Sequence, residues 1–293
     1  MNGIININKP KGFTSHDVVA KLRGILKTKK IGHTGTLDPD AVGVLPVCVG
    51  RATKVADMLT ASEKEYVAEV TLGSKTDTQD ASGTVLATAE VCVTEEDILR
   101  VAQEFVGDGM QIPPMYSAIK QDGKKLYELA RAGVEVEREP RPITIHAIEV
   151  KTLDLEHQRF TMRVACSKGT YIRTLCQDMG DRLGCFAHMS ALTRTRSGRF
   201  CLEDAITLED VERLTQGEDF SFLQPVDKVF EKFEPLYLSE RKAQLVCHGV
   251  QVRTPGLIEG TTYRVYDEKG NFLTLSLAEK GMLKILKTFY QNN

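Results

Sequence analysis

Residues 32–45 read Gly32-His33-Thr34-Gly35-Thr36-Leu37-Asp38-Pro39-Asp40-Ala41-Val42-Gly43-Val44-Leu45, and the apolar run continues to Val49. An apolar run of this length is typical of a buried strand. Pro39 has no N–H group and disfavours a helical backbone at Asp38. The segment therefore predicts a polar loop that holds the Asp38 carboxylate in a fixed direction at the start of a buried strand. Such a carboxylate suits a nucleophile or a base, whereas the plain alternative is an ordinary Asp-Pro turn.

The composition places the chain among globular proteins with more than one domain. Its length of 293 residues predicts about two domains. Its hydrophobic fraction of 42% is enough to bury a core. No stretch approaches the roughly 20 apolar residues of a membrane span, and Met1-Asn2-Gly3-Ile4 lacks the pattern of a signal peptide. The seven cysteines are scattered without a Cys-x-x-Cys pair. We therefore expect reduced thiols, no metal site and a cytoplasmic location.

Charge is segregated along the chain, although the net charge is only −2. Residues 1–54 hold nine Lys or Arg against three Asp or Glu, and residues 160–200 hold seven against two. Residues 85–110 and 201–224 are strongly acidic. If the two basic stretches fold side by side, they form a positive face that can bind phosphate groups. A single charged run more often serves only to solvate a surface.

Hydrophobic periodicity predicts an irregular mixture of strands and helices. Strands are expected at 3–8, 42–49, 66–72 and 159–166. Helices are expected from an N-cap at Ser15 to Leu26, from Thr94 to Phe105, and over 172–183 with Gly184 as the stop. Because the two kinds of element do not alternate regularly, an α+β fold with a mixed sheet is favoured over a doubly wound parallel sheet.

Two segments are predicted to be additions to this body. Prolines bracket a polar, lysine-rich excursion at about 115–142, which contains a short helix near Leu126. From about residue 232, a helix starting at Ser239 precedes three strands, at 263–266, 271–278 and 282–289. Lys280, Lys284 and Lys287 of this region could face phosphate groups or could protect a sheet edge from aggregation.

Several ordered motifs resemble those of the TruB-type tRNA pseudouridine synthases. The family's core motif is Gly-His-x-Gly-x-Leu-Asp-Pro, which matches residues 32–39. The flanking blocks are Lys9-Pro10-Lys11-Gly12 with Thr14-Ser15, Lys64-Glu65-Tyr66, Gly169-Thr170-Tyr171-Ile172-Arg173 and Leu192-Thr193-Arg194-Thr195. They occur in the family's order and span about two thirds of the chain.

The resemblance implies an architecture and a reaction. It implies a mixed-sheet pseudouridine synthase catalytic domain at 1–228 with a thumb-like insertion at about 115–142, and a small, β-barrel-like, PUA-type RNA-binding domain at 232–293. The expected reaction isomerises a uridine in the T-loop of tRNA to pseudouridine. The expected partner is the T-arm stem-loop of tRNA, with no cofactor, no membrane and no obligatory protein partner, the enzyme acting as a monomer.

The chemistry of the isomerisation assigns three catalytic roles. The N1–C1′ bond breaks and C5 is joined to C1′, which needs a nucleophile to attack C1′ or C6. Asp38 fits this role. Arg173 is expected to pair with Asp38, to lower its pKa and to orient both carboxylate oxygens. Tyr66 is expected to stack on the base and to assist removal of the C5 proton.

The resemblance also implies substrate contacts. A uridine within folded RNA must be flipped out of its stack, and His33 resembles the family residue that fills the vacated space. The implied substrate-binding residues are His33, Tyr171, Leu192, Asp80, Lys9 and Lys30. Each has an ordinary structural alternative: a loop histidine, core packing, a turn carboxylate or, for the lysines, bracing of a loop. Lys30 and Thr193 stand where the family often has arginine, which weakens a phosphate contact at either position.

Two other classes of protein fit part of the opening segment. Gly32-His33-Thr34-Gly35 matches the GxxG loop of KH-type RNA-binding modules, although such a loop should join two helices. A phosphate-cradling loop of a nucleotide hydrolase is the other alternative, but the Gly-Lys-Ser/Thr ending is missing and no strand is evident before it.

Overall fold

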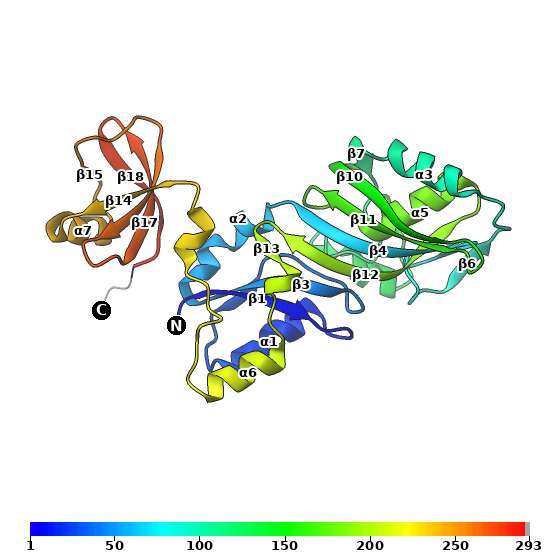
Figure 1. The fold of residues 1–293 in the computed structure, drawn as a ribbon, viewed down its shortest axis with the longest axis horizontal. Coiled ribbons are helices and arrows are strands. Elements are labelled where there is room, and N and C mark those ends of the chain that lie inside the picture. Colours follow the sequence, from blue (N-terminus) through cyan, green and yellow to red (C-terminus); the bar gives the residue numbers. More distant parts are fainter. Residues whose placement is uncertain (291–293) are drawn as a thin grey trace.

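The computed structural model describes residues 1–290, which form an elongated body and a smaller C-terminal lobe (Figure 1). The sheet of the body contains seven strands in the spatial order β1 (Gly3–Lys9), β3 (Val42–Val49), β12 (Ala187–Ser197), β4 (Lys64–Leu72), β11 (Arg159–Cys166), β10 (Arg141–Asp154) and β7 (Gly107–Gln111). Two short strands complete it: β2 (Ile31–His33) pairs with β3, and β13 (Phe200–Cys201) pairs with β12. Only β3 and β12 run parallel to each other, so the sheet is mixed.

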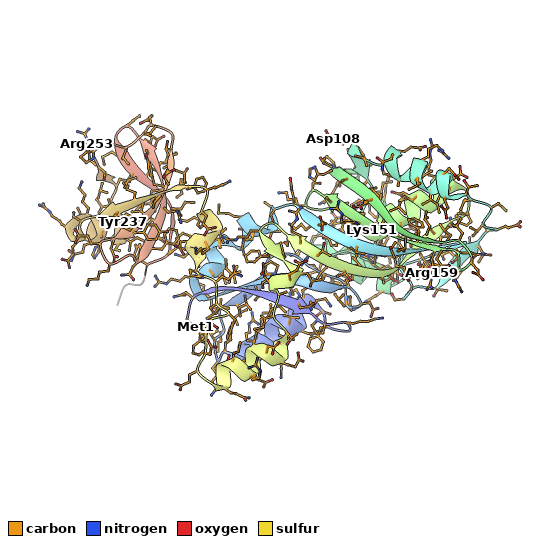
Figure 2. All side chains as sticks on the ribbon, in the orientation of Figure 1. Met1, Asp108, Lys151, Arg159, Tyr237 and Arg253 are labelled. Carbon is orange, nitrogen blue, oxygen red and sulfur yellow. The ribbon has the colours of Figure 1, made fainter. Side chains whose placement is uncertain are left out.

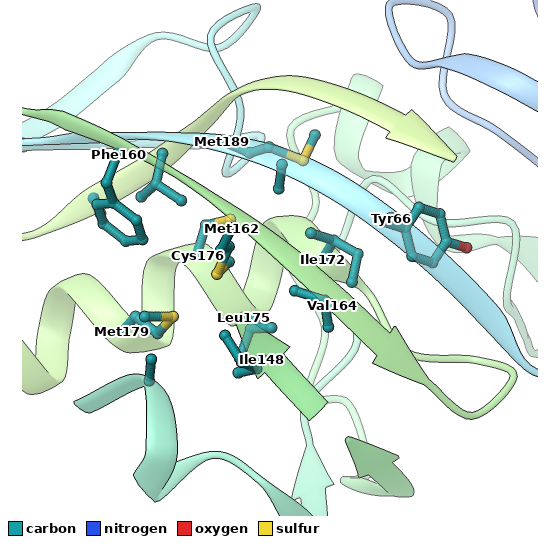
Figure 3. Packing of buried hydrophobic residues seen from close by; sticks show 14 of the residues in the cluster. Tyr66, Ile148, Phe160, Met162, Val164, Ile172, Leu175, Cys176, Met179 and Met189 are labelled. Atoms are coloured by element: carbon teal, nitrogen blue, oxygen red, sulfur yellow. The ribbon is translucent and has the colours of Figure 1, made fainter. Parts of the chain in front are cut away.

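Four helices cover the sheet of the body. Helices α3 (Glu95–Glu104) and α5 (Ile172–Leu183) bury their apolar sides against β4, β10, β11 and β12. Figure 3 shows this core, with Tyr66 at its edge and the Tyr66 hydroxyl directed away from the other labelled side chains. Helices α1 (Ser15–Ile25) and α6 (Leu208–Gln216) pack against β1, β2 and β3. The expected α+β fold with a mixed sheet is confirmed.

The N-terminal cap of α1 differs from the sequence prediction. Thr14, rather than Ser15, is the N-cap, and its hydroxyl accepts a hydrogen bond from the Asp17 backbone N–H while Asp17 accepts from the Thr14 backbone N–H. Such a reciprocal pair satisfies two donors that the first helical turn otherwise leaves free. Ser15 is thereby buried inside the helix, where its hydroxyl serves a different purpose described below.

The polar excursion lies between two paired strands at one edge of the sheet. Strands β7 and β10 form an antiparallel pair, and residues 112–140 between them leave and return to the sheet. This excursion contains β8 (Lys120–Gln121), β9 (Lys124–Lys125) and α4 (Leu126–Arg131). Helix α4 is the short helix predicted near Leu126. Another hairpin, β5 (Ser74–Thr76) with β6 (Val85–Thr88), projects from the sheet after β4.

The C-terminal lobe is a five-stranded sheet with one helix. Its strands lie in the order β14 (Glu234–Leu238), β16 (Thr262–Asp267), β17 (Phe272–Glu279), β18 (Met282–Thr288) and β15 (Val252–Arg253), and α7 (Glu240–Cys247) packs against them. Figure 2 labels Tyr237 and Arg253 on this lobe. The curled sheet is consistent with the expected PUA-type domain. The sequence pattern missed β14 and β15, and residues 291–293 of the expected domain lie outside the described residues.

An aromatic cluster joins the lobe to the body. Phe272 and Phe289 of the lobe stack with ring centroids 4.7 Å apart, and both rings also lie against Phe230. Phe230 belongs to the short 3-10 helix η3 (Val226–Phe230) that connects the two parts. At the rim of this contact the Lys54 ammonium donates to the Thr288 carbonyl oxygen at 2.8 Å. The lobe is therefore packed against the body through a buried apolar contact.

Candidate active site

The Asp38 loop, residues 34–41, joins β2 to β3 and is held by the buried side chain of Lys9. The Lys9 side chain has no exposed surface, and its ammonium donates to three carbonyl oxygens: those of Pro39 (2.9 Å), Pro10 (2.9 Å) and Phe13 (2.5 Å). Burial lowers the pKa of Lys9 to about 8. Lys9 therefore braces Pro39, the residue that follows Asp38. Of its two predicted roles, its burial favours bracing of the loop over a contact with phosphate.

Ser15 fixes the other side of Asp38. Its buried hydroxyl accepts a hydrogen bond from the Leu37 backbone N–H at 2.9 Å and donates to the Leu37 carbonyl oxygen at 3.3 Å. Ser15 and Lys9 thus hold the backbone immediately before and after Asp38. The Lys-Pro-Lys-Gly and Thr-Ser block near the N-terminus serves in this structure as the support of the loop.

Asp38 and Arg173 form the predicted two-point ion pair. The Arg173 Nε atom lies 3.0 Å from Asp38 Oδ2, and Nη2 lies 3.4 Å from Oδ1. The Arg173 side chain is only 6% exposed, whereas that of Asp38 is 36% exposed. Arg173 lies in the first turn of α5, as the sequence predicted. The carboxylate is therefore oriented from the protein side and remains accessible from outside.

Arg173 also connects three loops that are far apart in the sequence. Its Nη1 donates to the Thr78 carbonyl oxygen at 3.2 Å, and its Nη2 donates to the Tyr116 carbonyl oxygen at 2.9 Å. Asp80 Oδ2 lies 3.5 Å from Nη1. The hairpin after β4, the excursion and the Asp38 loop therefore meet at one guanidinium group.

The charge of Asp38 results from opposing influences. Burial raises its pKa above the ordinary value, Arg173 lowers it, and the neighbouring carboxylate of Asp80 raises it again. The net direction is upward. Arg173 therefore lowers the Asp38 pKa, in the direction expected from the sequence, but desolvation outweighs the ion pair.

Tyr66 and Leu192 form an apolar wall beside the Asp38 loop. Both are almost completely buried, and they belong to the same cluster as Leu37, the residue before Asp38. Burial raises the pKa of the Tyr66 phenol, and the nearby Asp38 acts in the same direction. Tyr66 is therefore a neutral phenol at the edge of the core, close to the carboxylate.

Tyr171 lies near Arg173 and Asp38, and His33 lies at the start of the Asp38 loop. His33 ends β2, its ring meets that of His16 edge to face at 5.1 Å, and burial lowers its pKa. Tyr171 is the N-cap residue of α5, and its backbone N–H donates to the side-chain oxygen of Gln111 at 2.8 Å. Gln111 is the last residue of β7, so it connects Tyr171 to the base of the excursion.

Asp80 belongs to the group around Arg173, whereas the structure groups Lys30 with other cations. One oxygen of Asp80 accepts from Thr78 and Ser82 within its own turn, which leaves the other oxygen toward Arg173. Lys30 is exposed at the opposite end of β2 from His33. Lys30 and Arg51 both lie near Lys54. Burial and these two like charges lower the pKa of Lys54.

Sequence reasoning overlooked Arg194 and Lys64 as parts of this region. Both side chains are buried, at 1% and 6% exposure. The sequence signal that could have found Arg194 is the alternation of side chains along a strand. Arg194 lies two residues after Leu192 and therefore on the same, inward face. Lys64 likewise shares the inward face of Tyr66, and its ammonium donates to the carbonyl oxygens of Thr60 and Ser62.

The topology argues against the two alternative classes. A KH-type loop should join two helices, but this loop joins β2 and β3. The strand β2 was not predicted, yet the loop after it leads into another strand rather than into the N-terminus of a helix, as a phosphate-cradling loop would. Within residues 1–290, no helix is long and apolar enough to cross a membrane.

The chain matches known proteins over its whole length. Residues 23–172 match the TruB family pseudouridylate synthase N-terminal domain, and residues 173–231 match the tRNA pseudouridylate synthase B C-terminal domain. The chain is 45% identical to the tRNA pseudouridine synthase B of Bacillus cereus, over 100% of this chain and 98% of the relative. It is 42% identical to that of Clostridium kluyveri, over 99% and 100%.

Solved structures agree with this result. A chain in the crystal structure of a Cbf5-Nop10-Gar1 complex superposes with a TM-score of 0.73 at 31% identity, covering 98% of this chain and 85% of that chain. A chain in the structure of an H/ACA RNP bound to a substrate RNA containing 2′-deoxyuridine also has a TM-score of 0.73, at 29% identity, with 99% and 85% covered. The chain therefore belongs to the TruB family, the tRNA pseudouridine synthases that isomerise uridine in tRNA to pseudouridine.

Proposed function

We propose that this enzyme modifies a uridine in the T-loop of tRNA, with Asp38 as the nucleophile. The observation that supports this role is the two-point contact between Asp38 and a nearly buried arginine, on a loop braced on both sides. Asp38 is the only member of the ion pair that remains substantially accessible. The T-loop as target rests on the motif resemblance.

The proposed mechanism uses the residues that the fold brings around Asp38. The Asp38 carboxylate attacks the substrate, either at C1′ of the ribose or at C6 of the base. Arg173 holds the two carboxylate oxygens in one orientation. The N1–C1′ bond breaks, and joining C5 to C1′ is followed or accompanied by release of Asp38 from the substrate. Tyr66 contacts the detached uracil, and its neutral hydroxyl assists transfer of the C5 proton to solvent while N1 takes up a proton. Leu192 completes the apolar wall of the base pocket.

Base flipping is part of the proposal. A T-loop uridine has to leave its stack to reach the Asp38 carboxylate, which lies beside the apolar wall formed by Tyr66 and Leu192. His33 is proposed to occupy the vacated space, because it lies at the entrance of the same loop with a lowered pKa and thus a largely neutral ring. Tyr171 and Asp80 are proposed to contact the substrate from the α5 side.

The arrangement of charge supports RNA binding despite the acidic total. Strand β3 of the first basic stretch is the neighbour of β12 of the second basic stretch in the sheet, and β1 lies on the other side of β3. Lys30 is proposed to contact phosphate together with its neighbours Arg51 and Lys54. The enzyme is proposed to act in the cytoplasm as a monomer, with the T-arm stem-loop as its minimal partner and without an obligatory protein partner.

The decisive experiment measures tritium release from a T-arm transcript that carries tritium at C5 of uridine, without added cofactor. We expect the parent enzyme to release tritium, and Asp38→Asn to bind the transcript normally but to lose at least a thousandfold in kcat, about 4 kcal/mol of barrier. Asp40→Asn is the matched control, because Asp40 is exposed two residues further on. Turnover by Asp38→Asn within tenfold of the parent would exclude Asp38 as the nucleophile.

A further inference from the structure

Arg194 is a buried cation that no step of the proposed mechanism uses. Its side chain is 1% exposed and is among the largest fully buried side chains of the protein. The Nη2 atom is buried and has no hydrogen-bond partner within residues 1–290. Burying a charge is costly unless it is paired or hydrogen-bonded. A cation retained in such a place therefore calls for a role beyond packing.

The strand register places Arg194 between the two halves of the active site. In the antiparallel pair β12–β4, Arg194 lies directly opposite Tyr66. In the parallel pair β12–β3, the same residue is the partner of Gly43. Directly opposite residues share one face of the sheet, with Cβ atoms about 5 Å apart. Tyr66 thus borders the guanidinium on one side, and the strand that follows the Asp38 loop borders it on the other.

Two hydrogen bonds connect Arg194 to the backbone around Asp38. Its Nε donates to the Val44 carbonyl oxygen at 2.6 Å, and its Nη1 lies 3.5 Å from the Thr36 carbonyl oxygen. Thr36 comes two residues before Asp38, and Val44 is near the start of β3. One planar group therefore spans both ends of the Asp38 loop, which a lysine ammonium cannot do from a single point.

The guanidinium also lies beside the Tyr66 phenol. Arg194 opposes the upward shift of the Tyr66 pKa that burial causes, which requires the two side chains to be close. The same guanidinium therefore touches the loop of the nucleophile and neighbours the ring that contacts the base.

We propose that Arg194 is a positioning residue for pseudouridine formation, which fixes the Asp38 loop and the Tyr66 ring at one spacing. It does not touch the substrate, because its own atoms are enclosed by β3, β4 and the loop. This proposal rests on the proposed roles of Asp38 and Tyr66. Its consequence is that damage at Arg194 reduces the rate of the chemical step and leaves RNA binding unchanged.

The first test compares Arg194→Lys with Arg196→Lys. The lysine at 194 keeps the charge but loses the span between two carbonyl oxygens, so kcat on the T-arm hairpin should fall about a hundredfold with KM within twofold. Arg196 lies two residues further along the same strand, and among the described residues its side chain donates only to the Gly198 carbonyl oxygen. Its substitution should leave both parameters within twofold. A change of less than twofold in kcat for Arg194→Lys overturns the proposal.

A double-mutant cycle separates positioning from general support of the fold. If Arg194 acts through the Tyr66 ring and hydroxyl, the penalty of Arg194→Lys should shrink to about tenfold or less in a Tyr66→Phe background. Penalties that simply multiply overturn the proposal. Thermal melts of Arg194→Lys and Arg194→Gln come first; if neither melts cooperatively, Arg194 only stabilises the fold and the proposal is wrong. An active Asp38→Asn enzyme instead contradicts the proposed function itself.

Discussion

At the scale of single residues, the Asp38 carboxylate depends on a balance between desolvation and one ion pair. Burial favours its neutral form, and a second carboxylate, Asp80, acts in the same direction. Arg173 opposes both and fixes the orientation of the group. A nucleophile held in this way is correctly directed, which lowers the cost of bringing it to the reacting carbon.

The contribution of the guanidinium fork can be measured with Arg173→Lys. The substitution keeps one positive charge but cannot contact both oxygens of Asp38 while it donates to the Thr78 and Tyr116 carbonyl oxygens. We expect kcat to fall about a hundredfold, about 2.7 kcal/mol, with RNA affinity within twofold. Arg182→Lys is the control, since Arg182 lies on the same helix, exposed and paired with Glu104. An equal loss of affinity and kcat would mean that Arg173 anchors phosphate.

The raised pKa of Asp38 predicts an acid limit of activity. Attack needs the carboxylate, so kcat/KM should fall as the pH drops through a pKa above the ordinary value of an aspartate. Asp80→Asn removes a charge that raises this pKa, so the acid limit should move to lower pH, whatever the absolute rate. Asp77→Asn, in the same turn but exposed, should leave the limit in place. A shift to higher pH, or an equal shift in both variants, would contradict the assignment.

At the scale of elements, the sequence predicted several helices and strands from local periodicity but missed others, including the two longest strands, β10 and β12. The helix 172–183 with its stop at Gly184, and the strand 159–166, occur at the expected residues because amphipathic periods are local. The strands β2 and β15 are too short to show a period, and β14 is largely exposed, so all three are defined by pairing with other strands. The Asp38–Arg173 pair was predicted only because the motifs resemble a family.

The buried arginine and lysine near the site were not predicted, for a physical reason. A charged residue on an inward face is normally unfavourable, so periodicity alone assigns such positions to a surface. Here carbonyl oxygens of loops satisfy the Lys9 and Lys64 ammonium groups and part of the Arg194 guanidinium. Which loops supply those oxygens is a property of the folded chain.

The close approach of β3 and β12 gives a prediction about a glycine. Gly43 has φ +99°, and a Cβ atom there would lie 2.4 Å from the Arg194 carbonyl oxygen. Gly43→Ala should therefore destabilise the fold by at least about 1–3 kcal/mol, seen as a lower melting temperature. Gly24→Ala in α1 meets open space and should be neutral or stabilising by up to about 1 kcal/mol. Equal melting temperatures for the two variants would contradict this account of the β3–β12 contact.

At the scale of the whole molecule, the C-terminal lobe is packed on the body and is proposed to bind RNA. The cluster of Phe230, Phe272 and Phe289 buries apolar surface from both parts. Stopping the chain at residue 231 would expose that surface, so a truncated enzyme should melt at a lower temperature. A loss of activity in the truncated form therefore cannot by itself identify an RNA contact.

Charge variants of β18 and its preceding turn test the RNA contact without opening the core. Lys280 and Lys284 are exposed, and Lys284 pairs only with Glu279 at the surface. If the lobe binds a distant part of tRNA, the double variant Lys280→Ser/Lys284→Ser should raise KM for full-length tRNA several-fold and leave KM for the isolated T-arm hairpin unchanged. The reason is that a linked second contact raises affinity through effective concentration, so kcat should be preserved on both substrates. Arg241→Ser, an exposed change on α7 away from that strand, is the control. An equal rise of KM on hairpin and tRNA would place these lysines at the T-arm itself, and no change on either would remove this strand from the RNA-binding surface.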